Sequence, residues 1–288
     1  MIGRFVIWAC FMLCLVVTGC KERLELDEGN AVYYWRTDLR LDSTERAFLR
    51  QYNINKVYCR YFDVVMNDEA EGPMPNATIT FSDTLPAGVE IVPTVYITIE
   101  SLQKPHEGLA AKLVKRIRQM NETNDISGVR EIQIDHDYTA RNMKIYYQFL
   151  NEVKQAWGGT LSTTIRLHQL SMEAPPVDYG ALMIYNTGDL QKWTERNPIL
   201  DYRDVAPYLQ YLDDYPLPMA AAYPVFSWLR IIGNVEIEHT VDASEIKKVK
   251  RMVEQKRKDL SRSIITYHLE KENINRYKPE TYEEIYHH

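Results

Sequence analysis

The sequence predicts a (β/α)8 barrel, in which eight parallel strands form a closed ring surrounded by helices. Eight short runs rich in β-branched and aromatic residues are separated by longer stretches, most of which carry apolar residues at helical spacing. This alternation over about 260 residues is the pattern of the barrel fold. The sequence has no GxGxxG or GxxxxGK motif, so a doubly wound nucleotide-binding fold has little support.

The expected strands are short and bounded by turn signals, and several alternate apolar and polar side chains. They cover residues 31–35, 56–62, 90–98, 131–137, 161–168, 181–185, 218–223 and 263–268. In a barrel, the apolar face of each strand would contact the helices and the other face would line the interior. An exposed antiparallel sheet could show the same alternation, but the intervening helices favour the barrel.

Helical patterns fill most of the segments between these strands. Asp42 and Asp242 can each cap the helix that follows them. The expected helices cover residues 43–52, 106–121, 140–157, 201–214 and 243–258, with a final short turn at 281–286. Pro207 is expected to interrupt or kink the fourth helix. Residues 67–88 and 169–177 contain proline and lack a helical pattern, so two of the crossovers are expected to be irregular.

The first twenty residues have the pattern of a targeting segment. Arg4 supplies a positive charge, and the apolar run 5–17 is too short to span a bilayer comfortably. The run closes on Val-Val-Thr-Gly-Cys at 16–20, which resembles a bacterial lipobox.

This resemblance implies that residues 1–19 are a signal peptide and that Cys20 is lipidated. Residues 20–30 would then tether a single barrel domain, 31–288, to a membrane of the bacterial cell envelope, in the periplasm or at the outer-membrane surface. An uncleaved membrane anchor and an ordinary secretory signal are the alternatives.

The charge and the cysteine content of the chain argue against nucleic acid, disulfide bonds and zinc. The net charge of −6 argues against nucleic acid as a main partner. Cys10 and Cys14 lie in the signal segment, so Cys59 has no disulfide partner if Cys20 carries lipid, and we expect it to be a small buried hydrophobe. No CxxC motif or Cys/His cluster indicates zinc, and we expect neither a metal nor a cofactor. The sequence does not indicate an oligomeric state.

The strand 131–137 carries the most informative motif. Ile132 and Ile134 point to one side, whereas Asp135 and Asp137 point to the other. Carboxylates at the C-terminal end of a barrel strand lie at the mouth, where barrel enzymes carry out their chemistry. The same alternation in the other strands predicts a set of side chains that meet there: Trp35, Arg60, Glu100, Asp135, Asp137, Arg166, His168, Tyr185 and His268.

Several of these side chains also have a structural interpretation. Arg60 and Arg166 could simply neutralise the two aspartates in an ion network. His168 and His268 could be hydrogen-bonded wall residues. Glu100 could lie in solvent just beyond its strand.

Other assignments stay open as well. Trp35 could be a capping aromatic residue instead of a sugar platform, and Tyr185 could belong to the core. His136 has the orientation opposite to the aspartates and is expected near the helices. The two aspartates and His168 could form a metal site, but no spacing requires one.

Five segments resemble (β/α)8-barrel lipoproteins of Bacteroidetes that are themselves similar to glycoside hydrolases. The segments are 34–36, 57–62, 133–139, 164–170 and 183–188. The resemblance covers most of the chain after the signal segment. It implies the fold more firmly than an activity, and it implies a glycan or another polar small molecule as the ligand.

A weaker resemblance is to the family-18 glycosidases, whose fourth strand ends in DxxDxDxE and whose sixth carries Met-x-Tyr-Asp/Asn. Asp135 and Asp137 match the last two aspartates, and residues 183–186 match the second motif. Ile132 stands at the first aspartate position, and Thr139 stands where the family has its catalytic glutamate. Because threonine cannot protonate a glycosidic oxygen, the family's mechanism would need another acid.

The first functional hypothesis is carboxylate-based hydrolysis of a glycan at the barrel mouth. Asp137 would act as acid or nucleophile and Asp135 as its partner or base, with Glu100 as a further candidate for the missing acid. The remaining side chains would bind the substrate: Trp35, Arg60, Arg166, His168, Tyr185 and His268.

The second hypothesis is a lipoprotein that binds a glycan without cleaving it, which Thr139 favours. The third is a structural or assembly protein whose mouth network is only scaffolding. Residues 224–240, which contain Phe226, Trp228 and Leu229, are expected to cover the mouth as a lid or a partner surface.

Overall fold

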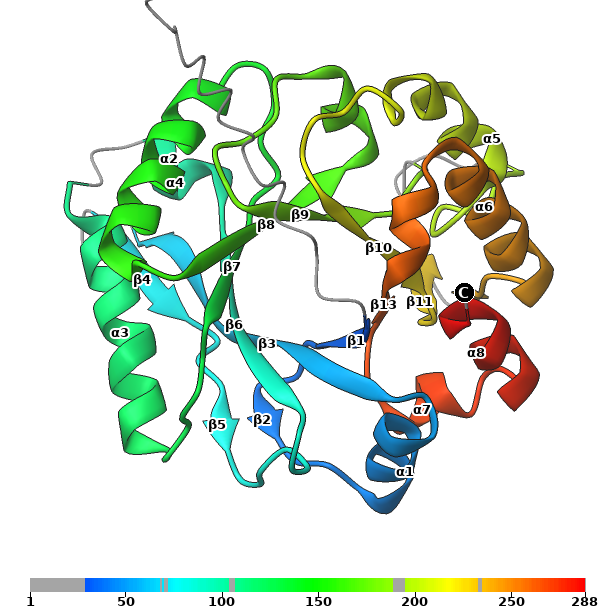
Figure 1. Cartoon of the computed structure of the whole chain (residues 1–288), viewed down its shortest axis with the longest axis horizontal. Coiled ribbons are helices and arrows are strands. Elements are labelled where there is room, and N and C mark those ends of the chain that lie inside the picture. Colours follow the sequence, from blue (N-terminus) through cyan, green and yellow to red (C-terminus); the bar gives the residue numbers. More distant parts are fainter. Residues whose placement is uncertain are drawn as a thin grey trace, which may run out of the picture.

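The protein folds as a closed (β/α)8 barrel, as the sequence predicts (Figure 1). The computed structural model describes residues 29–67, 69, 72–103, 107–188, 195–232 and 235–287. In chain order the barrel strands are β1 (Gly29–Tyr34), β3 (Ile54–Asn67), β6 (Glu90–Ile97), β7 (Glu131–Asp135), β8 (Thr160–Arg166), β9 (Tyr179–Met183), β10 (Met219–Pro224) and β13 (Ser263–Tyr267). All eight overlap the expected strands.

The first strand closes the ring. Val32 of β1 pairs with Val57 of β3 on one side and with Thr266 of β13 on the other, and every barrel pairing is parallel. All eight strands therefore end on the same side of the molecule, which we call the mouth. This closure leaves no open edge within the ring.

The helices lie outside the ring, and most fall where the periodicity predicts them. They are α1 (Ser43–Gln51), α2 (Ile99–Gln103), α3 (Leu109–Thr123), α4 (Met143–Trp157), α5 (Tyr202–Val205), α6 (Ala243–Lys256), α7 (Lys271–Ile274) and α8 (Pro279–Tyr286), together with the 3-10 turns η1 (Leu167–Ser171), η2 (Ala206–Tyr211) and η3 (Lys258–Arg262). The expected helix 201–214 is divided into α5 and η2, because Pro207 has no N–H for a helical bond.

The two crossovers expected to be irregular are irregular. After β3, the strand β4 (Gly72–Asn76) pairs back on it, and β5 (Thr80–Phe81) pairs with β2 (Asp38–Leu39). After β8, the chain turns through η1 without a full helix. A further hairpin, formed by β11 (Trp228–Ile232) and β12 (Val235–His239), follows β10.

The N-terminal boundary differs slightly from the expected one. Strand β1 begins at Gly29, so the expected tether 20–30 loses its last two residues to the barrel. The expected signal peptide and Cys20 lie outside the described residues. Within the described ranges, no helix is both long and apolar enough to cross a membrane. Cys59 is fully buried with a free thiol, in agreement with the prediction that it is a small hydrophobe.

The barrel interior is unusually polar for a packed core. Near the strand starts, Lys56 lies 2.9 Å from Glu131, which also accepts a 2.6 Å hydrogen bond from Ser162. One layer higher, the buried Tyr33 donates to Gln133 at 2.8 Å. Hydrogen bonding compensates the burial of these groups, so each layer fixes the relative positions of its strands. The mouth is built on this rigid base.

Helix α1 allows a test of the capping predicted from the sequence. The Asp42 carboxylate accepts from the Glu45 N–H at 2.9 Å, and the Glu45 side chain accepts from the Asp42 N–H, which completes a capping box. We expect Asp42→Ala to lower the free energy of unfolding by about 0.5–2 kcal/mol in urea titrations. The matched control is Asp242→Ala, because Asp242 precedes α6 without a side-chain cap bond. Equal losses in the two variants would contradict the assignment.

Candidate functional site

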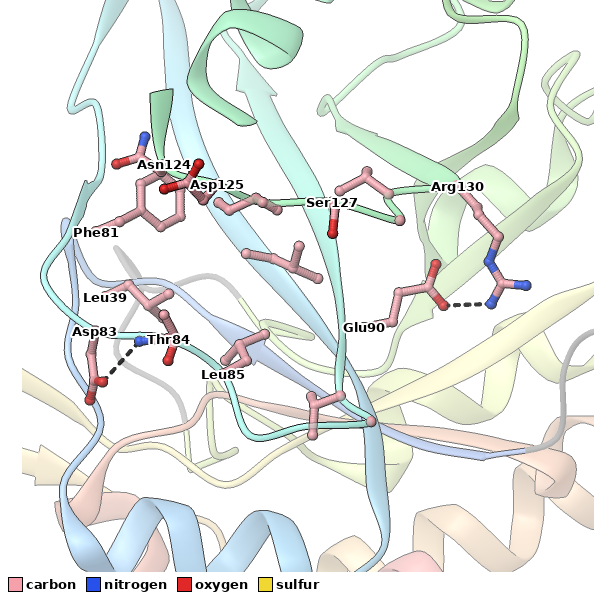
Figure 2. A pocket seen from close by; sticks show the side chains of 16 residues that line it. Leu39, Phe81, Asp83, Thr84, Leu85, Glu90, Asn124, Asp125, Ser127 and Arg130 are labelled. Carbon is pink, nitrogen blue, oxygen red and sulfur yellow. Dashed lines mark hydrogen bonds and ion pairs between the residues drawn. The ribbon is translucent and has the colours of Figure 1, made fainter. Parts of the chain in front are cut away.

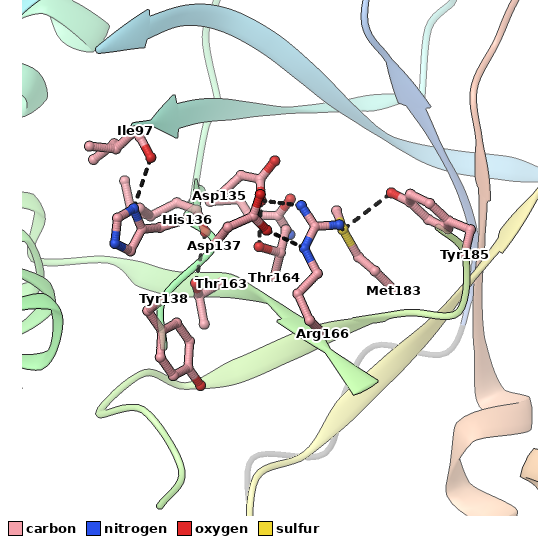
Figure 3. A network of polar contacts seen from close by, with 12 residues as sticks. Ile97, Asp135, His136, Asp137, Tyr138, Thr163, Thr164, Arg166, Met183 and Tyr185 are labelled. Atoms are coloured by element: carbon pink, nitrogen blue, oxygen red, sulfur yellow. Dashed lines mark hydrogen bonds and ion pairs between the residues drawn. The ribbon is translucent and has the colours of Figure 1, made fainter. Parts of the chain in front are cut away.

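Arg166, at the end of β8, is the centre of a polar network at the mouth (Figure 3). Its Nε donates to Asp137 Oδ1 at 2.5 Å, and its Nη2 lies 3.5 Å from Asp135 Oδ1. Its Nη1 lies 2.6 Å from the sulfur of Met183, at the end of β9. One guanidinium therefore connects the ends of three neighbouring strands.

The two aspartates have different environments. Asp135 is 3% exposed and accepts a 2.6 Å hydrogen bond from Thr164 Oγ1, whereas the Asp137 side chain is 45% exposed. Burial raises the pKa of Asp135, and the neighbouring Asp137 charge adds to this, although Arg166 opposes it. The buried Asp135 carboxyl group therefore holds its proton more strongly than an ordinary aspartate does.

The charge on Arg166 is secured by its partners. Burial alone would lower its pKa, but the adjacent Asp135 and Asp137 outweigh burial and raise the pKa above the ordinary value. The guanidinium consequently stays charged and is already engaged by two carboxylates.

Aromatic rings form the wall beside this network. Tyr267, at the end of β13, stacks on Tyr185 with ring centroids 5.0 Å apart, and it also contacts Tyr33 and Trp35 at 5.6 and 5.7 Å. Phe226 contacts both Tyr185 and Tyr267. The sequence argument included Trp35 and Tyr185 and missed Tyr267, the residue that joins them.

A second arginine reaches the interior through a β-bulge. The register of β3 shifts between Arg60 and Phe62, so Arg60 and Asp63 point to the same side although two residues separate them. The Arg60 Nε donates to Asp63 Oδ1 at 2.8 Å, and the guanidinium lies 5.6 Å from the centre of the Trp35 ring. Asp63 was not expected in the site because regular alternation would have turned it outward.

A pocket of about 410 Å³ opens beside Arg166. Its described lining residues are Asp137, Thr139, Arg166, Leu167, His168, Met183, Tyr185, Asn186, Thr187 and Tyr208. Of the expected site residues, the structure brings Asp137, Arg166, His168 and Tyr185 to this pocket. Asp135 lies beneath it, and Trp35 and Arg60 lie to one side.

The remaining expected residues lie differently. His168 lines the pocket but is exposed in η1, because the strand ends at Arg166 and the alternation that placed His168 no longer applies. Glu100 is exposed on α2, in agreement with its solvent interpretation. The expectation that His268 points into the mouth is wrong. Tyr267 takes that orientation instead, and His268 lies 3.7 Å from Glu270. Burial and the nearby Arg36 lower the pKa of His268 to about 4.

Thr139 has a structural role at the position where a catalytic glutamate was considered. Its N–H and Oγ1 lie 2.6 and 3.1 Å from the Asn142 side-chain oxygen, at the start of α4. His136 lies among the helices as expected, with Nδ1 2.8 Å from the Ile97 carbonyl. Among the described residues, no three acidic, histidine or cysteine side chains are grouped as a metal site would require.

A second hollow of about 390 Å³ lies at the opposite end of the barrel, where β6 and β7 begin (Figure 2). Apolar side chains such as Leu39, Phe81 and Leu85 line it, and the Glu90–Arg130 ion pair, 3.0 Å long, lies at its edge. Barrel chemistry occurs at the other end, and this end usually serves stability. The mouth pocket is therefore the candidate site.

Three further residues of the mouth are absent from the set predicted from the sequence. Met183 and Thr164 lie in expected strands, but nothing in their identity indicates that they contact Arg166 and Asp135. Tyr96 lines the same face of β6, and burial followed by the charges of Asp137 and Asp135 raises its pKa. Its inward orientation follows from alternation, which could have included it.

Comparisons with known proteins support the fold. No protein-family model and no curated protein matches the sequence. Among solved structures, a new form of xylanase-A-amylase inhibitor protein (XAIP-III) aligns with a TM-score of 0.51 and 12% identity over 90% of this chain and 97% of that one. A GH113 β-1,4-mannanase aligns with a TM-score of 0.50 and 10% identity over 91% and 93% of the two chains.

The catalytic domain of a hyperthermophilic chitinase from Pyrococcus furiosus aligns with a TM-score of 0.47 and 11% identity over 84% of each chain. A TM-score of 0.47 does not establish that the two proteins share a fold. At such identities the likeness shows the fold alone, a (β/α)8 barrel of the kind that glycoside hydrolases use.

The raised pKa of Asp135 predicts a specific pH dependence of stability. Above pH 3.8, the ordinary value, and up to its raised pKa, the folded state holds a proton that the unfolded state has lost, so this group's contribution to stability falls as pH rises. Asparagine has no such proton. We therefore expect the free energy of unfolding of Asp135→Asn, relative to wild type, to increase from about pH 4 to about pH 7 in urea titrations.

The control is Asp83→Asn. A hydrogen bond from Arg46 lowers the pKa of Asp83, so its contribution to stability is fully present above the ordinary value of 3.8 and is lost only at lower pH. The free energy of unfolding of Asp83→Asn, relative to wild type, should therefore stay nearly constant from about pH 4 to about pH 7. Parallel behaviour of the two variants would refute the assigned environment of Asp135.

Proposed function

We propose that the protein binds a glycan in the mouth pocket without cleaving it. The observation that carries the proposal is the lining of the pocket, which combines the aromatic rings of Tyr185 and Tyr208 with the polar side chains of Asn186, Thr187 and Asp137. Sugars present C–H faces that stack on rings and hydroxyls that both donate and accept hydrogen bonds. The pocket offers both kinds of contact.

The same lining argues against hydrolysis. Glycosidases use two carboxyl groups that flank the scissile bond, one of them as a general acid. Among the described lining residues Asp137 is the only carboxylate, and it is bound to Arg166. Asp135 is buried, and Thr139 has no acidic proton at the position of the expected acid.

Hydrolysis is the second candidate, because one observation favours it. The adjacent carboxyl groups Asp135 and Asp137 lie at the end of the fourth barrel strand, and the pKa of Asp135 is raised, as the pKa of a general acid must be. In this case Asp137 would be the nucleophile or acid, with Asp135 as its partner, because Glu100 is exposed on α2 and is not among the described lining residues.

Calorimetry and product analysis distinguish the two candidates. The solved neighbours include a β-1,4-mannanase, so mannohexaose is the first probe. Chitohexaose is the second, because residues 183–186 resemble a motif of the family-18 glycosidases. We expect wild type to bind at least one of them and to release no shorter product. Asp137→Asn and Asn186→Ala should each weaken binding at least about tenfold, since each removes polar contacts from a site built around them.

The control is Ser127→Ala in the second hollow, which should leave the affinity unchanged. If wild type releases shorter products and Asp137→Asn does not, the function is hydrolysis and not binding alone. Unchanged affinity in both pocket variants would overturn the site assignment.

We further propose that the chain is a lipoprotein of the bacterial cell envelope, anchored through Cys20, as in the Bacteroidetes family that it resembles. The lipobox-like segment 16–20 supports this. Within the described residues, the chain enters the barrel at Gly29, at the end opposite the mouth.

Cys20→Ser tests the anchor. In the bacterial host, wild type should incorporate labelled palmitate and partition into the detergent phase, whereas Cys20→Ser should do neither. Cys14→Ser is the control and should behave as wild type. Label retained in Cys20→Ser would contradict the proposal.

A further inference from the structure

The hairpin β11–β12 presents an exposed aromatic side chain near the mouth. Its first residue, Trp228, follows the end of β10 after three residues, and β10 ends at the mouth. The side chains of Trp228 and Leu229 are 39% and 56% exposed, which is unusual for such large apolar groups. An exposed tryptophan at the edge of a binding pocket is a possible platform for a ligand.

Trp228 is continuous with the aromatic wall of the pocket. Tyr185, which lines the pocket, contacts Phe226 at 5.9 Å, and Phe226 contacts Trp228 at 6.5 Å. The three rings therefore form one aromatic cluster, in which Trp228 is two ring contacts away from the pocket wall.

The base of the hairpin is fixed. Arg276 Nη2 donates to Ser227 Oγ at 2.7 Å, and Nη1 donates to Glu238 at 3.0 Å. These bonds connect the two sides of the hairpin to the segment after α7. A platform held in this way loses little conformational entropy when a ligand binds.

The charges around the pocket indicate the chemical class of the ligand. Arg166 is engaged by Asp135 and Asp137, and Arg60 is engaged by Asp63. No lysine is among the described lining residues of the pocket. An acidic sugar would place its carboxylate beside Asp137 without an uncommitted arginine or lysine among these residues to pair with it, and that costs binding energy.

We infer that the ligand is a neutral glycan chain, with terminal sugars in the mouth pocket and later sugars stacked on Trp228. The inference rests on the proposed glycan binding and adds the length and the charge of the ligand. The acidic partners of Arg60 and Arg166 disfavour the binding of uronic-acid chains. A single sugar in the pocket would not contact Trp228.

Chain length separates the platform from the pocket. Calorimetry with mannobiose and mannohexaose, or with the corresponding chito-oligosaccharides if these bind more tightly, is compared for wild type and Trp228→Ala. We expect Trp228→Ala to weaken binding of the hexasaccharide about three- to tenfold, the scale of one aromatic stacking contact, and to leave disaccharide affinity unchanged. Trp228→Phe should recover part of the loss.

The matched control is Trp157→Ala, because Trp157 is a partly exposed tryptophan beside the strand starts, at the far end of the barrel. It should leave both affinities unchanged, and thermal unfolding of each variant verifies folding. Trigalacturonic acid tests the charge, and we expect it to bind at least about tenfold more weakly than mannotriose.

The outcomes test the Trp228 platform and the neutral charge of the ligand separately from glycan binding in the pocket. Equal effects of Trp228→Ala on both chain lengths, or no effect on either, overturn the platform while binding that depends on Asp137 stands. If trigalacturonic acid binds more tightly than mannotriose, the inference that the ligand is neutral is wrong, but glycan binding in the pocket stands. Failure of wild type to bind any of these chains overturns the proposed function and the inference together.

Discussion

The arrangement of the mouth depends on the ion pairs of one arginine. Arg166 holds the exposed Asp137 and the buried Asp135 on β7 and the sulfur of Met183 on β9, so the ends of three strands share one guanidinium. A buried charge left without its partner costs about 3–5 kcal/mol, so the charge of Arg166 depends on the carboxylates beside it. These contacts fix the positions of Asp137, Arg166 and Met183, which line the pocket and carry its charges.

Further ion pairs lie inside the barrel at other levels along its axis. The Lys56–Glu131 pair near the strand starts and the Arg60–Asp63 pair near the mouth each balance a charge inside the ring. The Lys56–Glu131 pair joins β3 to β7, whereas the Arg60–Asp63 pair lies within β3. The polar contacts near the strand starts therefore help to hold the strands in place below the mouth.

The sequence carried enough information for the architecture and for part of the site. Period-two alternation located the eight strands, and it oriented Asp135, Asp137 and Arg166 toward one another. It failed where the backbone departs from regular geometry. The bulge after Arg60 turned Asp63 inward, and the early end of β8 moved His168 onto a turn. Such departures are set by tertiary pairing, which one sequence does not display.

Closure of the ring by β1 has a consequence for how the chain folds. Strand β1 pairs with β13, whose residues lie more than two hundred positions later in the sequence. Until Ser263–Tyr267 has been made, the growing chain has unpaired strand edges at both ends of its sheet, where other strands can add. Pairings over such separations also form slowly. The nascent chain therefore exposes these edges through almost all of its synthesis, and the ring can close only when its last strand has been made.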